Sequence, residues 1–172
     1  MSQGQILYAK VDRTYVIKFA GEVRYTICAP LSAFVDRLES QSDFDDVVID
    51  LTDTEAIDST NLGMLARIAN LVQDRFHHKT TLVSSNEDVN HVLHTMGFYQ
   101  VFNIDEHPLT EKIRVSDFPA VDEPERRTAK AILDAHRMLA SLNEPNRKLF
   151  RDVLEALERD SDRSAGEPPT VH

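Results

Sequence analysis

Hydrophobic and polar positions along the first part of the chain predict a sheet. Residues 6–11 and 14–20 are rich in β-forming side chains, and the pair Asp12-Arg13 between them indicates a hairpin. Residues 47–51 form a short apolar run that is typical of a strand buried on both faces, and the polar residues 52–55 are expected to end it. A hairpin beside a fully buried strand predicts a sheet with a covered centre.

Three segments repeat apolar residues at helical spacing. The first is expected to begin between residues 26 and 30, the second follows Asp58-Ser59-Thr60, and the third is capped at residue 85 or 86 and closed by Gly97. Their apolar faces are formed by Leu31, Phe34, Val35 and Leu38, by Leu62, Leu65, Ala69, Val72 and Phe76, and by Val89, Val92, Leu93 and Met96. Each helix is therefore amphipathic and is expected to cover a sheet.

Two further strands, at residues 79–84 and 99–104, complete the order β-β-α-β-α-β-α-β. Crossover helices between strands imply parallel pairing, so the later strands are expected to run parallel. The pattern predicts one α/β domain over residues 5–104.

The remainder of the chain differs in composition. Residues 105–123 contain two prolines and little periodicity, so we expect a linker or an arm lying over the domain. Residues 124–159 predict two amphipathic helices in an antiparallel hairpin, which must bury its apolar faces on the domain or on a partner. Residues 160–172 are rich in Ser, Asp, Gly and Pro and are expected to be disordered.

Composition narrows the function. The net charge of −10 and a pI near 5.1 argue against a nucleic-acid-binding surface, which needs a basic face. A single cysteine, Cys28, permits no intramolecular disulfide and suits a reducing compartment. No apolar run approaches about 18 residues and the N-terminus lacks a basic and apolar signal, so we expect a cytoplasmic protein that does not bind membranes.

Ser59 is the residue around which the chemistry can be argued, because it lies where a strand passes to a helix N-terminus. As a cap, its hydroxyl would accept a backbone N–H. As a nucleophile it would need a base, but the sequence has no Gly-x-Ser-x-Gly motif and no histidine that identifies itself as the partner. As a phosphorylation site, it would add a charge of about −2 at a helix end that tolerates an anion.

The segment from Ile57 to Gly63, which reads Ile-Asp-Ser-Thr-Asn-Leu-Gly after the strand Val-Ile-Asp-Leu, resembles the phosphorylation motif of STAS-domain anti-sigma factor antagonists. The resemblance covers residues 5–104, roughly three-fifths of the chain, and implies a STAS-like mixed sheet flanked by helices, with the helical hairpin as a C-terminal extension. Asn61 departs from the glycine that is frequent in the family, which costs little because a first-turn residue needs no positive φ.

That resemblance implies a function. Unmodified protein would bind an anti-sigma factor and free a sigma factor, and a dedicated serine kinase and phosphatase would act on Ser59. We expect the rim of the helix around Ser59 to be exposed and to bind the partner. The partner-binding residues predicted on this basis are Asp58, Ser59, Thr60, Asn61, Met64 and Arg67. Length, the region 21–23 and the segment 96–99 are similar to antagonists that act downstream of phosphorelays controlling biofilm and flagellar genes.

Other residues in the sequence give weaker evidence of a chemical function. His77 and His78 suit the C-terminal end of a helix dipole, and His91 and His94 lie three residues apart without an acidic or cysteine ligand at recognisable spacing, so no metal site is expected. No glycine-rich phosphate loop is present, and no cofactor is expected. The remaining alternatives to a binding module are a serine hydrolase using Ser59 and a phosphotransfer receiver. The receiver would use the acidic residues Asp45, Asp46, Asp50 and Asp53.

Overall fold

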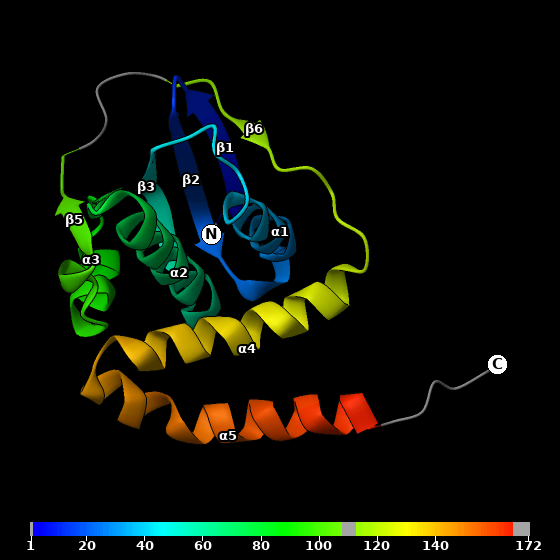
Figure 1. Cartoon of the computed structure of the whole chain (residues 1–172). Coiled ribbons are helices and arrows are strands. Elements are labelled where there is room, and N and C mark those ends of the chain that lie inside the picture. Colours follow the sequence, from blue (N-terminus) through cyan, green and yellow to red (C-terminus); the bar gives the residue numbers. More distant parts are fainter. Residues whose placement is uncertain (1, 108–112, 167–172) are drawn as a thin grey trace.

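The computed structural model describes residues 2–107 and 113–166 (Figure 1). The strands are β1 (Gln5–Val11), β2 (Thr14–Val23), β3 (Asp46–Ile57), β4 (Thr80–Val83), β5 (Phe102–Asp105) and β6 (Ser116–Asp117). The α-helices are α1 (Ala29–Leu38), α2 (Ser59–Phe76), α3 (Glu87–Thr95), α4 (Pro124–Leu142) and α5 (Glu144–Gly166). Two 3-10 turns, η1 (Tyr25–Ile27) and η2 (Phe98–Gln100), precede α1 and β5.

The strands form one mixed sheet in the order β5-β4-β3-β2-β1-β6. β1 pairs antiparallel with β2 and β6, whereas β2, β3, β4 and β5 pair in parallel. This confirms the predicted hairpin and the predicted parallel pairing of the later strands, and it makes the fold the expected α/β class. The centre of the sheet is apolar: Ile17 and Phe19 on β2 and Ile49 and Leu51 on β3 are fully buried.

Two predicted strand boundaries are wrong, for identifiable reasons. β3 does not end at residues 52–55 but continues to Ile57, because β2 pairs with it as far as Val23 opposite Ile57. The hydroxyl of buried Thr54 donates to the Phe19 carbonyl, so its polar group is satisfied inside the sheet. The second boundary is the start of the strand predicted at residues 99–104. Residues 98–100 form η2 instead, and β5 begins only at Phe102.

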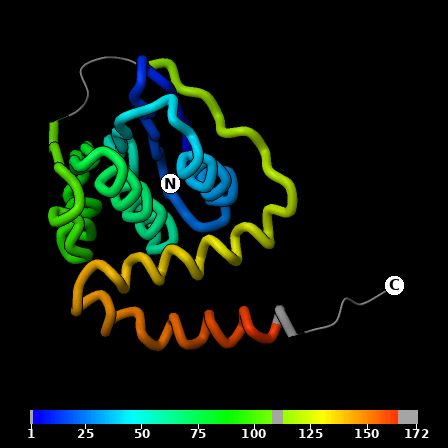
Figure 2. The backbone as a smooth tube through the Cα atoms, in the orientation of Figure 1, coloured from blue at the N-terminus to red at the C-terminus, as the bar shows by residue number. Residues whose placement is uncertain are grey.

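The C-terminal helices form a separate layer (Figures 1 and 2). α4 crosses one end of the domain, and α5 returns along α4 on the side away from the sheet. α4 packs on α2, α1, η1 and α5, so it contacts the domain through helices. The helical hairpin therefore exists as predicted, and within this structure its first helix is buried in cis.

The segment between the domain and α4 acts as an arm. β6 adds to the edge of the sheet beside β1, and buried Phe118 stacks on Tyr8 with ring centroids 4.7 Å apart.

At the C-terminal end of the described chain, α5 continues to Gly166. The disorder expected from residue 160 is therefore wrong up to that point, and residues 167–172 lie outside the described part. None of the helices in the described residues is both long enough and apolar enough to cross a membrane.

Candidate functional site

Ser59 is the first residue of α2, and Asp58 is the residue that caps the helix. Asp58 is extended, with φ −86° and ψ 170°, and its carboxylate accepts the Asn61 backbone N–H at 3.0 Å and the Asn61 side-chain N–H at 2.9 Å. The second oxygen of Asp58 accepts the Tyr25 backbone N–H. Since Asp58 performs the capping, the interpretation of Ser59 as the N-cap is wrong, and its hydroxyl is available for another contact.

That contact is with His136 on α4, 77 residues away in the sequence. Ser59 Oγ lies 2.9 Å from His136 Nε2, and His136 Nδ1 lies 2.6 Å from the Ile132 carbonyl oxygen. A carbonyl can only accept, so Nδ1 donates to it; in the neutral ring Nε2 then accepts the Ser59 hydroxyl, and in the protonated ring Nε2 donates to Ser59 Oγ. His136 is buried, with the ring of Phe150 on α5 edge-on at 5.5 Å.

α4 lies against the backbone of α2 beside this contact. A Cβ atom added at Gly63 would stand 2.3 Å from the Ala135 carbonyl oxygen and 2.6 Å from its Cα. Only glycine allows this approach, because any side chain would force the two helices apart. The glycine of the Leu-Gly pair in the sequence motif is thus the point at which α4 is closest to α2.

The predicted exposed rim of α2 is buried in this structure. Thr60, Asn61 and Met64 are at most 4% exposed, whereas Ser59 and Asp58 are partly exposed. The expectation of exposure is therefore wrong for these three residues. Within the described residues, the Asn61 side-chain oxygen has no hydrogen-bond partner.

Arg67 is one of the predicted partner-binding residues, and in this structure it pairs within the chain. Its guanidinium lies 2.7 Å from Asp36 on α1 and 2.6 Å from Glu39. Asp36 also pairs with Arg127 of α4 at 2.8 Å. Burial alone would raise the pKa of Asp36, but the hydrogen bonds from Arg67 and Arg127 outweigh it and lower that pKa below its usual value. Asp36 therefore ties α4 to both α1 and α2.

We call the surface of α1 and α2 that α4 covers the Ser59 face, and define it by Asp36, Ser59, Gly63 and Arg67. The end of α4 is held separately: the Asn146 side chain donates to the Met96 carbonyl at 2.9 Å and to the Leu139 carbonyl at 3.0 Å. His136, Asp36 and Arg127 were missed by sequence reasoning. The one signal that the sequence carries concerns His136, which is a histidine within an otherwise apolar helical face.

Other sequence candidates are not brought together. Asp46 begins β3 and Asp50 lies four residues along it, where its carboxylate accepts the Thr52 hydroxyl at 2.6 Å. Asp53 pairs with Lys18 at 2.7 Å, and Asp45 with Arg13 at 3.2 Å at the start of the strand. Residues four apart on a strand are separated by about 13 Å, so Asp46 and Asp50 are not neighbours. Asp53 and Asp50 both help to raise the pKa of Lys18, but the four carboxylates are not gathered at one place, and in the described part of the chain no three such side chains are grouped as metal ligands.

The histidines of the first domain have local roles. His77 adopts a left-handed conformation at the C-cap of α2, with φ 61°. The pKa of His78 is raised by hydrogen bonds to the backbone carbonyls of Lys79 and Asp45, with burial opposing the shift. His91 and His94 are exposed on α3. Among the described residues, no three His, Cys, Asp or Glu side chains are grouped as metal ligands.

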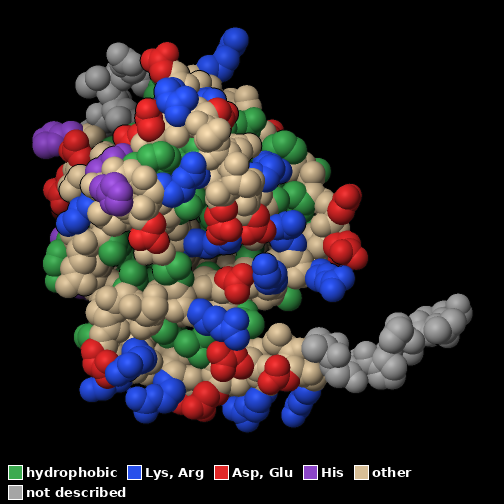
Figure 3. All heavy atoms as spheres, in the orientation of Figure 1, with side chains coloured by type: hydrophobic (Ala, Val, Ile, Leu, Met, Phe, Trp, Pro, Cys, Tyr) green, Lys and Arg blue, Asp and Glu red, His purple; other side chains and the backbone are tan. Residues whose placement is uncertain are grey.

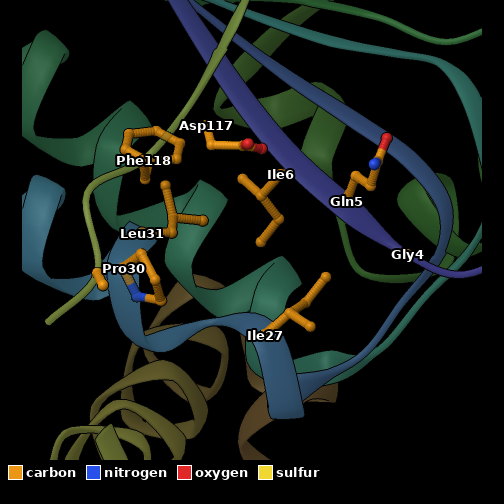
Figure 4. Close-up of a pocket in the computed structure, with 9 residues that line it drawn as sticks. Gly4, Gln5, Ile6, Ile27, Pro30, Leu31, Asp117 and Phe118 are labelled. Atoms are coloured by element: carbon orange, nitrogen blue, oxygen red, sulfur yellow. The ribbon is translucent and has the colours of Figure 1, made fainter.

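The surface charge and the cavity beside the arm are two other features that a ligand could use. On the face in Figure 3, lysine and arginine side chains alternate with acidic ones instead of gathering into one basic patch. A cavity of about 340 Å³ lies between the arm and the start of α1, where Ile6, Leu31 and Phe118 point toward one another (Figure 4). Its lining is mostly apolar and includes the Asp117 side chain, and it does not include Ser59 or His136.

Comparison with known proteins agrees with this architecture. The STAS domain family model matches residues 5–110, and the chain belongs to that family. An anti-sigma factor antagonist from Mycobacterium paratuberculosis is similar in structure, with a TM-score of 0.52, 19% identity, and coverage of 61% of this chain and 87% of that one. α4 and α5 lie outside the residues that the family model matches.

Two structures of the antagonist SpoIIAA are also similar. The unphosphorylated form has a TM-score of 0.49 and 15% identity over 61% of this chain and 89% of that chain. The phosphorylated form from Bacillus has the same TM-score and identity over 61% of this chain and 93% of that chain. Comparison with curated proteins found no match.

Proposed function

We propose that this chain is an anti-sigma factor antagonist that binds an anti-sigma factor while Ser59 is unmodified and releases it when Ser59 is phosphorylated. A serine kinase would form the bond between Ser59 Oγ and the γ-phosphorus of ATP, with loss of ADP and the hydroxyl proton, and a phosphatase would hydrolyse that bond. The observation that carries the proposal is the position of Ser59 at the start of α2 in a STAS domain, where it is partly exposed and does not serve as the helix cap.

Electrostatics supports a switch at this position. A phosphoryl group at a helix N-terminus is tolerated in the free protein, because the backbone N–H groups and the helix dipole favour an anion. In a docked interface the same dianion would lie beside Asp58 in a chain of net charge −10. An unpaired charge buried there costs about 3–5 kcal/mol, near the roughly 5.5 kcal/mol that moves a partition from 1:99 to 99:1.

The proposed contact residues are Asp58, Ser59, Thr60, Asn61, Met64 and Arg67. The resemblance to antagonists that control biofilm and flagellar genes extends the proposal to sigma-dependent transcription of such genes in the cytoplasm. In this function the protein is a binding module and not an enzyme.

Calorimetric titration against the anti-sigma factor of the same organism tests the proposal. Ser59→Ala should bind constitutively, and Ser59→Asp should bind more weakly than wild type with an unchanged circular dichroism spectrum. Ser85→Asp, at an exposed serine before α3, is the matched control and should bind as wild type does. Equal affinities for Ser59→Asp and Ser59→Ala would overturn the switch.

One observation favours a second candidate function. The Ser59 hydroxyl donates to a histidine whose other nitrogen is held by a carbonyl, which is the arrangement of a nucleophile and its general base. Against a hydrolase, the four cavities at the arm, between α4 and α5, at the β1 edge and beside Asp36 are lined by residues other than Ser59 and His136. A hydrolase would turn over aryl esters and lose that activity in His136→Ala, whereas a binding module would leave the esters intact.

A further inference from the structure

α4 occupies the Ser59 face as a ligand would. It contributes His136 to Ser59, Arg127 to Asp36, and the backbone at Ala135 to Gly63. These contacts reach Ser59 directly and Arg67 through Asp36, and both residues are among those at which we propose that the partner binds. While α4 is in place Ser59 Oγ is in contact with His136, so a partner must compete with α4 for this serine.

We propose that α4 is a reversible intramolecular ligand of the Ser59 face, and that the external partner displaces it with an amphipathic helix of the same kind. This inference rests on the proposed function for the identity of the face. In the closed state α4 covers the face. In the open state α4 has left, and both the partner and the kinase gain access to Ser59.

The packing of α4 favours a docked helix over an integral core element. Its buried residues are mostly small or polar, namely Ala131, Leu133, Ala135, His136, Leu139 and Ala140. α4 contacts the domain through α1, α2 and η1, and the chain reaches it through the arm. In the proposed open state the sheet and its covering helices keep the packing they make with one another, and they lose the apolar contacts that Leu139 adds to the core.

The exposure of the ion pair at the contact also favours reversibility. The ion pair between Asp36 and Arg127 is partly exposed, with side chains 36% and 35% accessible, so water can replace it. A closed population lowers the apparent affinity of the partner by the fraction of molecules that are open.

The same contacts define the chemistry of the partner's helix. Where Ala135 meets Gly63 the helix must carry a small residue, because the α2 backbone is in direct contact. Two turns earlier it needs a cation for Asp36, in the place of Arg127. We therefore expect a helix with an arginine or lysine eight residues before an alanine, glycine or serine.

The single cysteine reports on the state of α4. Cys28 is fully buried at the start of α1, which packs on α4, and Thr128 of α4 is one of the residues that act on the pKa of its thiol. Burial raises the pKa of the Cys28 thiol to about 11, with the Asp58 charge adding to the shift. A thiol reagent such as dithionitrobenzoate therefore reacts at this one site when α4 opens, and the measurement needs no partner or kinase.

The experiment uses the full chain and two substitutions on α4 that leave the Ser59 face unchanged. Ala135→Glu places a carboxylate at the buried contact with Gly63, and it should raise Cys28 labelling at least about tenfold, because a buried unpaired charge disfavours docking. Ala129→Glu makes the same change at an exposed position of α4 and should label as wild type does.

Arg127→Glu is the milder variant should Ala135→Glu unfold. It should raise labelling about fivefold while the melting temperature of the sheet domain stays unchanged. Arg126→Glu, at a side chain that is 84% exposed, is its control. A fluorescent peptide of residues 124–142 should then bind to Ala135→Glu and not to wild type or to Ala129→Glu.

Two results would overturn the inference. One is labelling of Arg127→Glu at the rate of Arg126→Glu. The other is labelling of wild type only at its rate of global unfolding, measured by circular dichroism in denaturant, because α4 would then be part of the core. Failure of the proposed function looks different: Cys28 labelling and peptide binding succeed, but the anti-sigma factor does not distinguish Ser59→Ala from Ser59→Asp.

Discussion

The centre of the sheet and the helical hairpin are stabilised by different means. Phe19 and Ile49 on adjacent strands are fully buried among large apolar side chains, whereas α4 is seated through three alanines, two leucines, a histidine and an ion pair. α5 is a step further from the domain and packs on α4. Burial of large apolar side chains makes the sheet cooperative, whereas the hairpin depends on a few specific contacts that can be broken one at a time.

The largest effect is expected at the centre of the sheet. Phe19→Ala removes a fully buried ring and should lower the free energy of unfolding by about 3–5 kcal/mol. Urea denaturation followed by circular dichroism measures this, with Tyr99→Ala, at a side chain 54% exposed, as the control. A loss confined to the hairpin would contradict the comparison.

A smaller and more local effect is expected in α4. Leu139 is fully buried, and Leu139→Ala should cost about 2 kcal/mol, the lower end for such a change, because the displaced helix can readjust. Hydrogen exchange should show faster exchange in α4 and α5, with β2 and β3 unchanged. Equal acceleration in the strands would mean that the hairpin and the sheet unfold together.

Acid should loosen the hairpin through Asp36. Its pKa is lowered in the folded protein, so the stabilisation is present above the unfolded carboxyl's pKa of about 3.9 and is lost as pH falls through the folded value. The pair is partly exposed, so the effect is about 1 kcal/mol or less.

Cys28 labelling with dithiodipyridine, which reacts in acid, should rise between pH 5 and pH 3 in wild type. Asp36→Asn should label faster than wild type at pH 6 and change less over that range. The far-UV spectrum, recorded in parallel, identifies the pH at which the sheet itself unfolds. Labelling that increases only with that spectral change would contradict a separate opening of α4.

The smallest effect is expected on the outer face of α5. Leu149 is 59% exposed, and Leu149→Ala should change the free energy of unfolding by less than about 0.5 kcal/mol. Phe150→Ala, the matched change at the buried neighbour beside His136, should be several times larger. Similar losses for the two variants, measured by urea denaturation, would show that the outer face of α5 is covered in solution.

The strands and most helices were predictable because their signals are local. Two runs rich in β-forming residues around Asp12-Arg13 identified the β-hairpin, the apolar run 47–51 identified a buried strand, and helical periodicity identified the helical hairpin of α4 and α5. The end of β3 was not predictable, since pairing with β2 overrides the polar character of residues 52–55. Similarly, the polar composition after residue 160 does not prevent α5 from continuing to Gly166.

The sequence by itself determined the class of the domain, the place of Ser59 at a helix start and the existence of two amphipathic helices after the arm. Only the tertiary structure decided that Asp58 is the cap, that His136 reaches Ser59, and that α4 covers Gly63. The physical reason is the range of the interactions. Propensity and periodicity act within a few residues, whereas the contact of α4 with α2 joins segments 77 residues apart, and neither carries a local pattern that identifies the other.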